Sequence, residues 1–439
     1  MAFRSFESSA LSRRAMFRGS AYLAAGGALA SVPFGRDLLR AHDVSAMWPR
    51  VAERVEYYVG SLKVANMVAS FGMGGGDPHS VARGTLSFGG TTAANLDSLY
   101  RIYSMTKPIT GMAAMMLVED GKLGLDQPIA DFLPGFAEMR VLRRADGPLD
   151  DTVPAERPIT PRQLMTHTAG LGYDIVTKGP LLVAYREYGI SGGQISRMPI
   201  PGIPIAKSAP GLEVWADRLA TLPLITQPGT FWSYSVGLDL LGRVIEVASG
   251  QSFADFLQQR LFDPCGMEST WFQVPQSEVG RLTDNYGVLA GMPLPIDPAR
   301  ASIFLDSPPV HWGGSGLVSS PRDYDRFLKM LAGYGKIDGK RVMGDLAVRV
   351  GTSNILPETA TTKGTWVAGQ GFGAGGRVVG QTYGWGGAAG TLSAVDMGSG
   401  LRSGLYTQYM PTEAYPMRDE FLAALEQDLA ALRDAKQAA

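Results

Sequence analysis

The 439-residue chain has one cysteine, Cys265, which excludes an internal disulfide framework and any metal site built from several cysteines. Its four histidines lie far apart and none forms an H-E-x-x-H pair, so we expect neither a metal nor another cofactor. An excess of charge of one sign is also missing, since 40 Lys and Arg against 41 Asp and Glu give a net charge of −1. This balance argues against nucleic acid or an anionic membrane as a partner.

Long hydrophobic runs are absent too, and no stretch is suited to span a bilayer as a helix. The apolar residues 21–30 follow the paired Arg13 and Arg14 and end in Ala28-Leu29-Ala30, a small-x-small sequence typical of signal-peptidase sites. The pattern resembles a twin-arginine signal, so residues 1–30 are predicted to be cleaved on export to the periplasm, leaving a mature chain without a membrane span. If the segment is an uncleaved basic helix instead, the protein stays in the cytoplasm.

What is present is the composition of a globular protein, with 45% hydrophobic and 18% charged residues. Strand-like patterns lie near both ends of the chain, at 63–71, 83–88, 377–379, 391–395 and 404–408. Helical patterns dominate between them, at 162–166, 237–248 and 253–261. We therefore expect a discontinuous α/β domain, residues 41–125 and 306–439, that encloses a mostly helical domain, residues 126–305. No pattern predicts an oligomeric state.

The tetrapeptide Ser104-Met105-Thr106-Lys107 carries the clearest chemistry. Residues three apart on a helix share one face, so the lysine amine can take the proton of the serine hydroxyl and make it a nucleophile. The positive end of the helix, together with burial, disfavours an ammonium and leaves more of the Lys107 amine neutral. The same helix end offers the Ser104 backbone N–H to a developing oxyanion. Alone, S-x-x-K occurs by chance in many proteins, and an exposed lysine is then the default interpretation.

The surroundings of this tetrapeptide resemble the class C β-lactamase-related serine hydrolases, and family VIII carboxylesterases in particular. Six segments carry the resemblance in order along the chain: 101–110 (RIYSMTKPIT), 164–171 (LMTHTAGL), 228–235 (PGTFWSYS), 261–267 (LFDPCGM), 313–320 (GGSGLVSS) and 384–391 (GWGGAAGT). The resemblance implies the β-lactamase and penicillin-binding-protein fold, an antiparallel-sheet α/β domain with an inserted helical domain.

It also implies roles for individual residues. Ser104 would attack an acyl carbonyl, and Lys107 would share the proton. Tyr234 would act as or with the general base; a free phenol ionises only near pH 10, so it needs a cation beside it. The Ala388 N–H, on an edge strand, would join that of Ser104 in an oxyanion hole.

The departures from the lactamase pattern point to the substrate. Val236 stands where class C enzymes have the Asn of Tyr-x-Asn, and Trp385-Gly386-Gly387 replaces their Lys-Thr-Gly, so the segment brings no cation for a β-lactam carboxylate. We therefore expect an uncharged ester with apolar or aromatic groups, bound by Trp385, Gly386, Gly387 and Tyr103.

Several other activities remain open on the same fold. The alternatives are an amidase or peptidase acting on D-amino-acid peptides, oligopeptides or cyclic amides, and an acyltransferase. A β-lactamase and a non-catalytic penicillin-binding-like receptor are less favoured. In each reading the partner is a small-molecule ester or amide.

Three further patterns predict little. Ser191 lies in G-x-S-x-G, but a helical pattern at 181–188 precedes it, whereas a nucleophile elbow requires a strand there. Residues 371–376 fit G-x-G-x-x-G, yet a strand-like run follows in place of a helix. His167 could be a general base, but its context favours a structural hydrogen bond.

Overall fold

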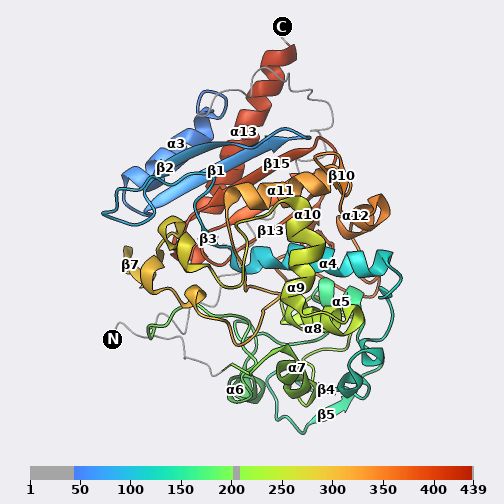
Figure 1. Cartoon of the computed structure of the whole chain (residues 1–439). Helices are drawn as coiled ribbons and strands as arrows, with labels where there is room; N and C mark the ends of the chain where they lie inside the picture. The colour runs from blue at the N-terminus through green and yellow to red at the C-terminus, as the bar shows by residue number, and fades with distance from the viewer. Residues whose placement is uncertain (1–43, 201–207, 438–439) are drawn as a thin grey trace.

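The computed structural model describes residues 44–200 and 208–437 (Figure 1). The signal predicted at residues 1–30 lies outside the described residues. At the centre is a seven-stranded sheet in which every neighbouring pair is antiparallel. Its strands, in spatial order, are β11 (Gly371–Phe372), β12 (Arg377–Val379), β13 (Thr382–Gly386), β14 (Leu392–Asp396), β15 (Leu401–Tyr406), β1 (Asn66–Met73) and β2 (His79–Gly84).

Helices cover both faces of this sheet (Figure 1). On one face lie α3 (Pro49–Gly60) and the C-terminal α13 (Met417–Gln437), joined to the sheet by an apolar cluster in which Trp48 stacks on Phe71 with ring centroids 4.3 Å apart. On the other face lie α11 (Pro321–Ala332) and, next to β13, α4 (Thr106–Glu119). The chain thus returns after some 300 residues to complete the sheet that β1 and β2 begin.

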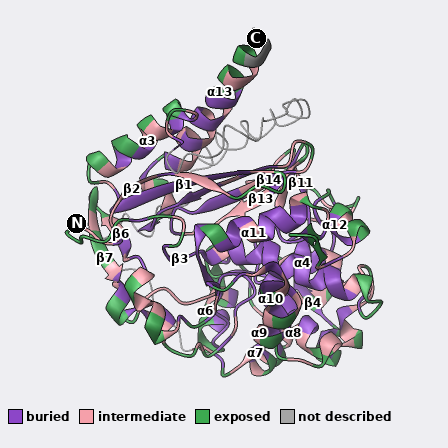
Figure 2. Cartoon of the chain, turned by 45° about the horizontal axis from the view of Figure 1, so that its top comes forward, coloured by how far each residue is buried: buried purple, intermediate pink, exposed green. Residues whose placement is uncertain are grey.

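The helix α4 is the centre of the larger core. Twelve of its 14 residues are buried, and Figure 2 shows it purple along most of its length. A helix that is apolar all round belongs inside a protein. The one charged residue among those twelve, Lys107, must therefore find partners within the core.

The rest of the chain packs around α4 and at the far end from α3 and α13 (Figure 1). Its helices are α5 (Pro161–Met165), α6 (Gly179–Glu187), α7 (Leu212–Ala220), α8 (Gly237–Ser249), α9 (Phe253–Leu257), α10 (Asp263–Cys265) and α12 (Asp345–Gly351). Its strands form small sheets: β3 (Tyr100–Arg101) with β8 (Val318–Ser319), β4 (Arg140–Leu142) with β5 (Thr152–Pro154), β9 (Lys336–Ile337) with β10 (Lys340–Arg341), and β6 (Asn285–Leu289) with β7 (Met292–Asp297) and β16 (Tyr409–Met410).

Two of the predicted elements have different boundaries in the structure. The strand predicted at 83–88 lies earlier, because Gly84 has φ +84° and a Cβ there would lie 2.1 Å from the Ala65 carbonyl oxygen, which only glycine allows. The helix predicted at 253–261 changes after Leu257 into a π-helical turn, Gln258–Phe262. The segment 126–305 is helical but also holds two β-hairpins; its standing as a separate domain stays a prediction.

The strand that leads to Ala388 corrects a further expectation. It was predicted at the edge of the sheet, but β13 lies between β12 and β14 in the interior, and β11 and β2 are the edges. The helices of the described residues include none with the length and apolar character that crossing a membrane requires.

Candidate active site

Ser104 lies in a short 3-10 turn, Tyr103–Met105, which connects β3 to α4. The predicted helix thus begins two residues later than Ser104, with Lys107 in its first turn. The strand before the turn is anchored by Arg101, whose buried guanidinium bonds Asp297 at 2.6 Å and Ser302 at 3.0 Å. The Ser104 side chain itself is half-buried, so its oxygen sits at the margin of the core.

The three side chains that the sequence groups together converge on one atom. Lys107 Nζ donates to Ser104 Oγ at 3.2 Å, and the Tyr234 hydroxyl donates to the same oxygen at 2.8 Å. Tyr234 comes from the segment just before α8, 130 positions along the chain. The lysine amine and the tyrosine phenol are therefore both close enough to the serine hydroxyl for direct proton transfer.

Lys107 has no exposed surface and is surrounded by groups that favour its charged form. Nζ donates to the Gly314 carbonyl oxygen at 2.8 Å. It also lies 4.5 Å from the centroid of the Tyr234 ring and 5.7 Å from that of Tyr173. A carbonyl oxygen and two aromatic faces stabilise an ammonium. They oppose burial and the helix end, the two effects expected to leave the amine neutral.

The Tyr234 ring is held among aromatic side chains. Trp385 donates its Nε1–H to the phenol oxygen at 3.2 Å, so the predicted substrate-binding tryptophan is tied to the predicted base. The rings of Trp366 and Tyr173 lie 5.1 and 5.4 Å from Tyr234. Trp366 and Trp385 are both partly exposed, which gives the site an aromatic wall. Sequence patterns do not single out Trp366, since its segment matches none of the family segments.

His167 supports this arrangement without touching Ser104. Its Nδ1 accepts from the Ser235 backbone N–H at 3.2 Å and lies 3.0 Å from Ser235 Oγ, and its ring lies 4.7 Å from Tyr234. Burial, with the nearby Lys107 charge, holds the pKa of His167 well below its usual value, so the imidazole is neutral. These contacts agree with the structural interpretation and not with a general base.

The backbone around Ala388 is fixed by contacts on both sides. Gly387 N–H donates to Thr391 O at 2.8 Å, and Thr412 Oγ1 donates to Ala388 O at 2.8 Å. Gly387 lies against the residue that links β3 to the turn of Ser104, because a Cβ there would be 2.1 Å from Ile102 O. Within the described residues, neither the Ala388 nor the Ser104 N–H donates a hydrogen bond. Both donors are thus available to a ligand oxygen.

Two further side chains lie near this part of the site. A cation does lie beside the Trp-Gly-Gly segment: Arg418, near the start of α13, donates to Gly387 O, and a Cβ at Gly386 would be 3.1 Å from its guanidinium. Tyr103 packs against Phe304 in a separate small core cluster, and its hydroxyl accepts from Asn285 at 3.2 Å. Its contact with substrate stays a prediction.

The G-x-S-x-G and G-x-G-x-x-G sequences both have structural roles. Ser191 follows α6 with no strand before it, and its Oγ lies 3.1 Å from Ser208 Oγ. Residues 371–376 comprise β11 and the turn that leads to β12, where a Cβ at Gly375 would lie 2.2 Å from Lys107 O. The glycines there allow a hairpin to pack on α4. Among the described residues, no group of three or more His, Cys, Asp or Glu is placed to hold a metal ion.

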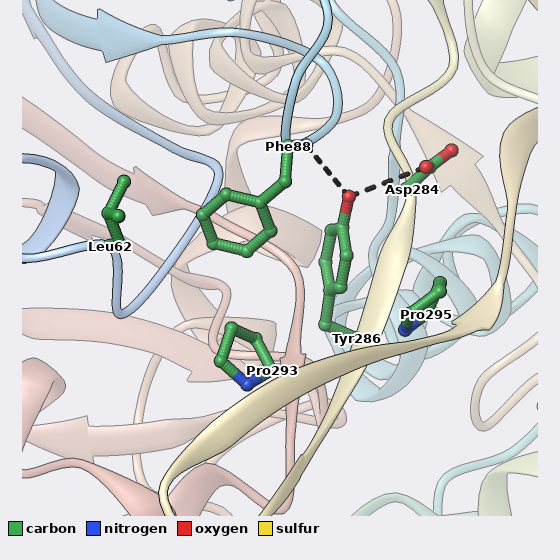
Figure 3. A pocket seen from close by; sticks show the side chains of 6 residues that line it. All are labelled: Leu62, Phe88, Asp284, Tyr286, Pro293 and Pro295. Atoms are coloured by element: carbon green, nitrogen blue, oxygen red, sulfur yellow. Dashed lines mark hydrogen bonds between the residues drawn. The ribbon is translucent and has the colours of Figure 1, made fainter.

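A surface hollow lies outside this site. Its volume is about 450 Å³, and Figure 3 shows Phe88 and Tyr286 facing each other beside two prolines of β7. The Tyr286 hydroxyl accepts from the Phe88 N–H at 2.9 Å. Its lining residues include none of Ser104, Lys107 and Tyr234.

The chain matches the family model described as Beta-lactamase over residues 64–428. It is 36% identical over 262 residues to Protein Rv1367c of Mycobacterium tuberculosis (60% of this chain, 61% of that protein) and 34% identical over 252 residues to Esterase EstB of Burkholderia gladioli (54% and 57%). The chain spans about three fifths or less of the length of these curated relatives.

Two solved structures show the same fold. EstCE1, described as a hydrolase with promiscuous acyltransferase activity, superposes with a TM-score of 0.69 at 22% identity, covering 86% of this chain and 99% of that one. A simvastatin synthase mutant from Aspergillus terreus gives 0.67 at 21% identity, covering 89% and 98%. With the family model matched over residues 64–428 and this fold in place, the chain belongs to the beta-lactamase family.

Proposed function

We propose that the protein is a serine hydrolase that cleaves carboxylic esters through an acyl-enzyme on Ser104. The observation that carries the proposal is the convergence of Lys107 Nζ and Tyr234 OH on Ser104 Oγ, at 3.2 and 2.8 Å. A serine hydroxyl becomes a nucleophile when a base takes its proton, and both candidate bases are within reach here. Relatives named as esterases support the ester as substrate.

In the proposed reaction Ser104 Oγ bonds to the acyl carbon while its proton moves to the Lys107–Tyr234 pair. The carbonyl oxygen, now negative, accepts hydrogen bonds from the N–H groups of Ser104 and Ala388. When the C–O bond of the ester breaks, the alkoxide leaves with the proton returned by the pair. Water then repeats these steps on the acyl-enzyme and releases the acid.

The aromatic wall favours an acyl or alcohol part with apolar surface. Trp366 and Trp385 are partly exposed beside Tyr234 and offer such surface. Val236, by contrast, is fully buried, so this position offers no polar contact to a β-lactam side chain. We expect short and medium-chain aryl esters to be cleaved well and nitrocefin poorly.

The test compares the wild type with Ser104→Ala and Ser191→Ala. Ser104→Ala is expected to abolish both p-nitrophenyl ester turnover and labelling by a fluorophosphonate, whereas Ser191→Ala, in the G-x-S-x-G sequence, retains both. Intact-mass analysis of the quenched reaction locates the acyl group. Turnover that survives in Ser104→Ala, or disappears in Ser191→Ala, contradicts the proposal.

Acyl transfer is the second candidate, because a relative that is 27% identical over 240 residues, from Penicillium decumbens, bears the name Acyltransferase calJ. The acyl-enzyme is the same, and an alcohol in place of water resolves it. Product analysis with an added alcohol separates the two activities. A matched p-nitroanilide measures the amidase alternative, since amide cleavage differs mainly in protonation of the leaving group.

We also propose the periplasm as the location, on the twin-arginine-like sequence alone. Fractionation of cells that express the full chain, with N-terminal sequencing of the exported protein, tests it. A protein that remains in the cytoplasm with residues 1–30 intact overturns it.

A further inference from the structure

Asp239 is a buried carboxyl group close to the reacting atoms that the mechanism above does not use. It lies in the first turn of α8, which packs directly on α4, and it has no exposed surface. Its Oδ1 accepts from the Gly314 N–H at 2.8 Å, and the Gly314 carbonyl oxygen accepts from Lys107 Nζ at 2.8 Å. One glycine residue therefore connects the carboxyl group to the lysine amine.

Only glycine fits between these two groups. A Cβ at Gly314 would lie 2.8 Å from Asp239 Oδ2 and 3.0 Å from Oδ1. Gly314 points its N–H at the carboxyl group and its C=O at the amine. The N–H therefore stabilises a negative charge on Asp239, and the C=O stabilises a positive charge on Lys107.

The second carboxyl oxygen, Oδ2, has no hydrogen-bond partner among the described residues. A buried, half-satisfied carboxyl group is costly, so fold stability alone does not explain it. Burial raises the pKa of Asp239 to about 7, and the Lys107 charge and the Gly314 N–H act in the opposite direction. Asp174 and Tyr173 are the other titratable groups whose charges interact with it. The carboxyl group thus changes charge in the range where enzymes are assayed.

We propose that Asp239 is a positioning residue that holds Lys107 as the ammonium through Gly314, so that Tyr234 takes the proton of Ser104. The inference rests on the proposed function and assigns the two bases that it leaves open. In the contact seen here the Tyr234 hydroxyl donates to Ser104 Oγ. Once the phenol has released that proton to solvent, its oxygen takes the Ser104 proton along the same 2.8 Å contact as Oγ bonds to the acyl carbon. The phenol then returns that proton to the leaving alkoxide, and Lys107 keeps its three protons throughout.

The test is the pH dependence of Ser104 labelling by a fluorophosphonate, from pH 5 to pH 10, in the wild type and Asp239→Asn. Asparagine keeps an oxygen for the Gly314 N–H but carries no charge. At pH 5, where the wild-type carboxyl group is protonated, we expect similar rates. Above pH 7 the rates diverge, and Asp239→Asn is labelled more slowly than the wild type, because its Lys107 lacks the countercharge.

Asp323→Asn is the matched control. Asp323 is also a buried carboxyl group that accepts a backbone N–H, from Ser269 at 2.6 Å, but it contacts none of the three reacting residues. Its pH profile is expected to coincide with that of the wild type. If Asp239→Asn does not fold, Asp239→Ser, which keeps a smaller hydrogen-bonding oxygen, is measured with the same criteria.

Two results overturn the proposal. A loss of rate by the same factor at every pH shows that Asp239 acts on the fold alone. A gain in rate near pH 7 that persists to pH 10 shows that neutral Lys107 is the base. A wild-type protein that is not labelled on Ser104 at any pH refutes the proposed function itself and is thereby distinguished from both.

Discussion

Arg418 donates a hydrogen bond to the carbonyl oxygen of Gly387, in the same peptide unit that carries the Ala388 N–H. In a trans peptide the C=O and N–H point in opposite directions, so a cation on the oxygen fixes where the N–H points and strengthens it as a donor. A residue of the C-terminal helix thus orients a main-chain N–H that an ordinary side-chain substitution of Ala388 leaves in place.

This contact predicts that Arg418→Gln lowers kcat on a p-nitrophenyl ester by about 10- to 100-fold, less than the loss of a whole oxyanion-hole donor. KM for a small uncharged ester is expected to change little. Arg349→Gln, on an exposed arginine of α12, serves as the control with unchanged kinetics. An Arg418→Gln enzyme with wild-type kcat shows that the Gly387–Ala388 peptide keeps its direction without the cation.

Trp385 has two separable parts, an indole N–H bonded to Tyr234 and a ring that lines the site. Trp385→Phe keeps an aromatic surface and removes the hydrogen bond. A hydrogen bond to a group that becomes charged contributes about 1.5–3 kcal/mol, so kcat is expected to fall by about 10- to 100-fold. Steady-state kinetics with two esters of different chain length provide the measurement. If KM rises while kcat is retained, Trp385 acts through its surface alone.

The ion pair of Arg101 and Asp297 is predicted to be a main determinant of stability near the site. Both side chains are buried, and Asp297 also accepts from Ser302 at 2.6 Å and from the Ile303 N–H at 2.9 Å. Asp297→Ala leaves a buried guanidinium uncompensated, which costs about 3–5 kcal/mol of unfolding free energy. Urea unfolding measures it, with Asp345→Ala in an exposed pair as the control that leaves stability unchanged. Similar midpoints for the two variants contradict the prediction.

The raised pKa of the buried Asp239 carboxyl group predicts how the stability of the protein depends on pH. Its pKa is about 7 in the folded protein and about 3.9 in an unfolded chain. Between these values the folded state holds a proton that the unfolded state has lost, so the contribution of this group to the unfolding free energy falls as the pH rises, by up to about 4 kcal/mol. Asparagine does not titrate.

The unfolding free energy of Asp239→Asn is therefore expected to rise relative to that of the wild type as the pH increases from 4.5 to 8. Urea unfolding of the two proteins at pH 4.5, 6 and 8 gives the difference directly. A difference that is the same at all three pH values would show that the Asp239 carboxyl group titrates normally.

Much of the architecture followed from local patterns. The strand predicted at 377–379 coincides with β12, and the helix predicted at 237–248 differs from α8 by one residue. These segments have a clear period of apolar residues and end at glycine or a polar turn. The strand predicted at 63–71 is displaced to 66–73, because the end of a strand depends on its partners β2 and β15 and not on its own sequence.

The candidate site was predicted unevenly. Ser104, Lys107 and Tyr234 were named from short patterns and the family resemblance, and the structure brings them together. Trp366 and Arg418 were missed because each joins the site from a segment that carries no catalytic motif. Asp239 had a faint signal, a carboxylate among the apolar residues of a helix, which becomes meaningful only when its burial is known.

The sequence by itself determined that Ser104 and Lys107 are neighbours, because three positions of separation in a helical turn place two side chains on one face. Only the tertiary structure decided what surrounds the lysine amine. Tyr234 lies 130 positions along the chain from its bonding partner Ser104, and Gly314 lies 207 positions from Lys107. Both reach the amine because α4 is packed between α8 and the sheet. The charge of a buried group depends on its contacts, and contacts between such distant segments arise from packing that no local pattern encodes.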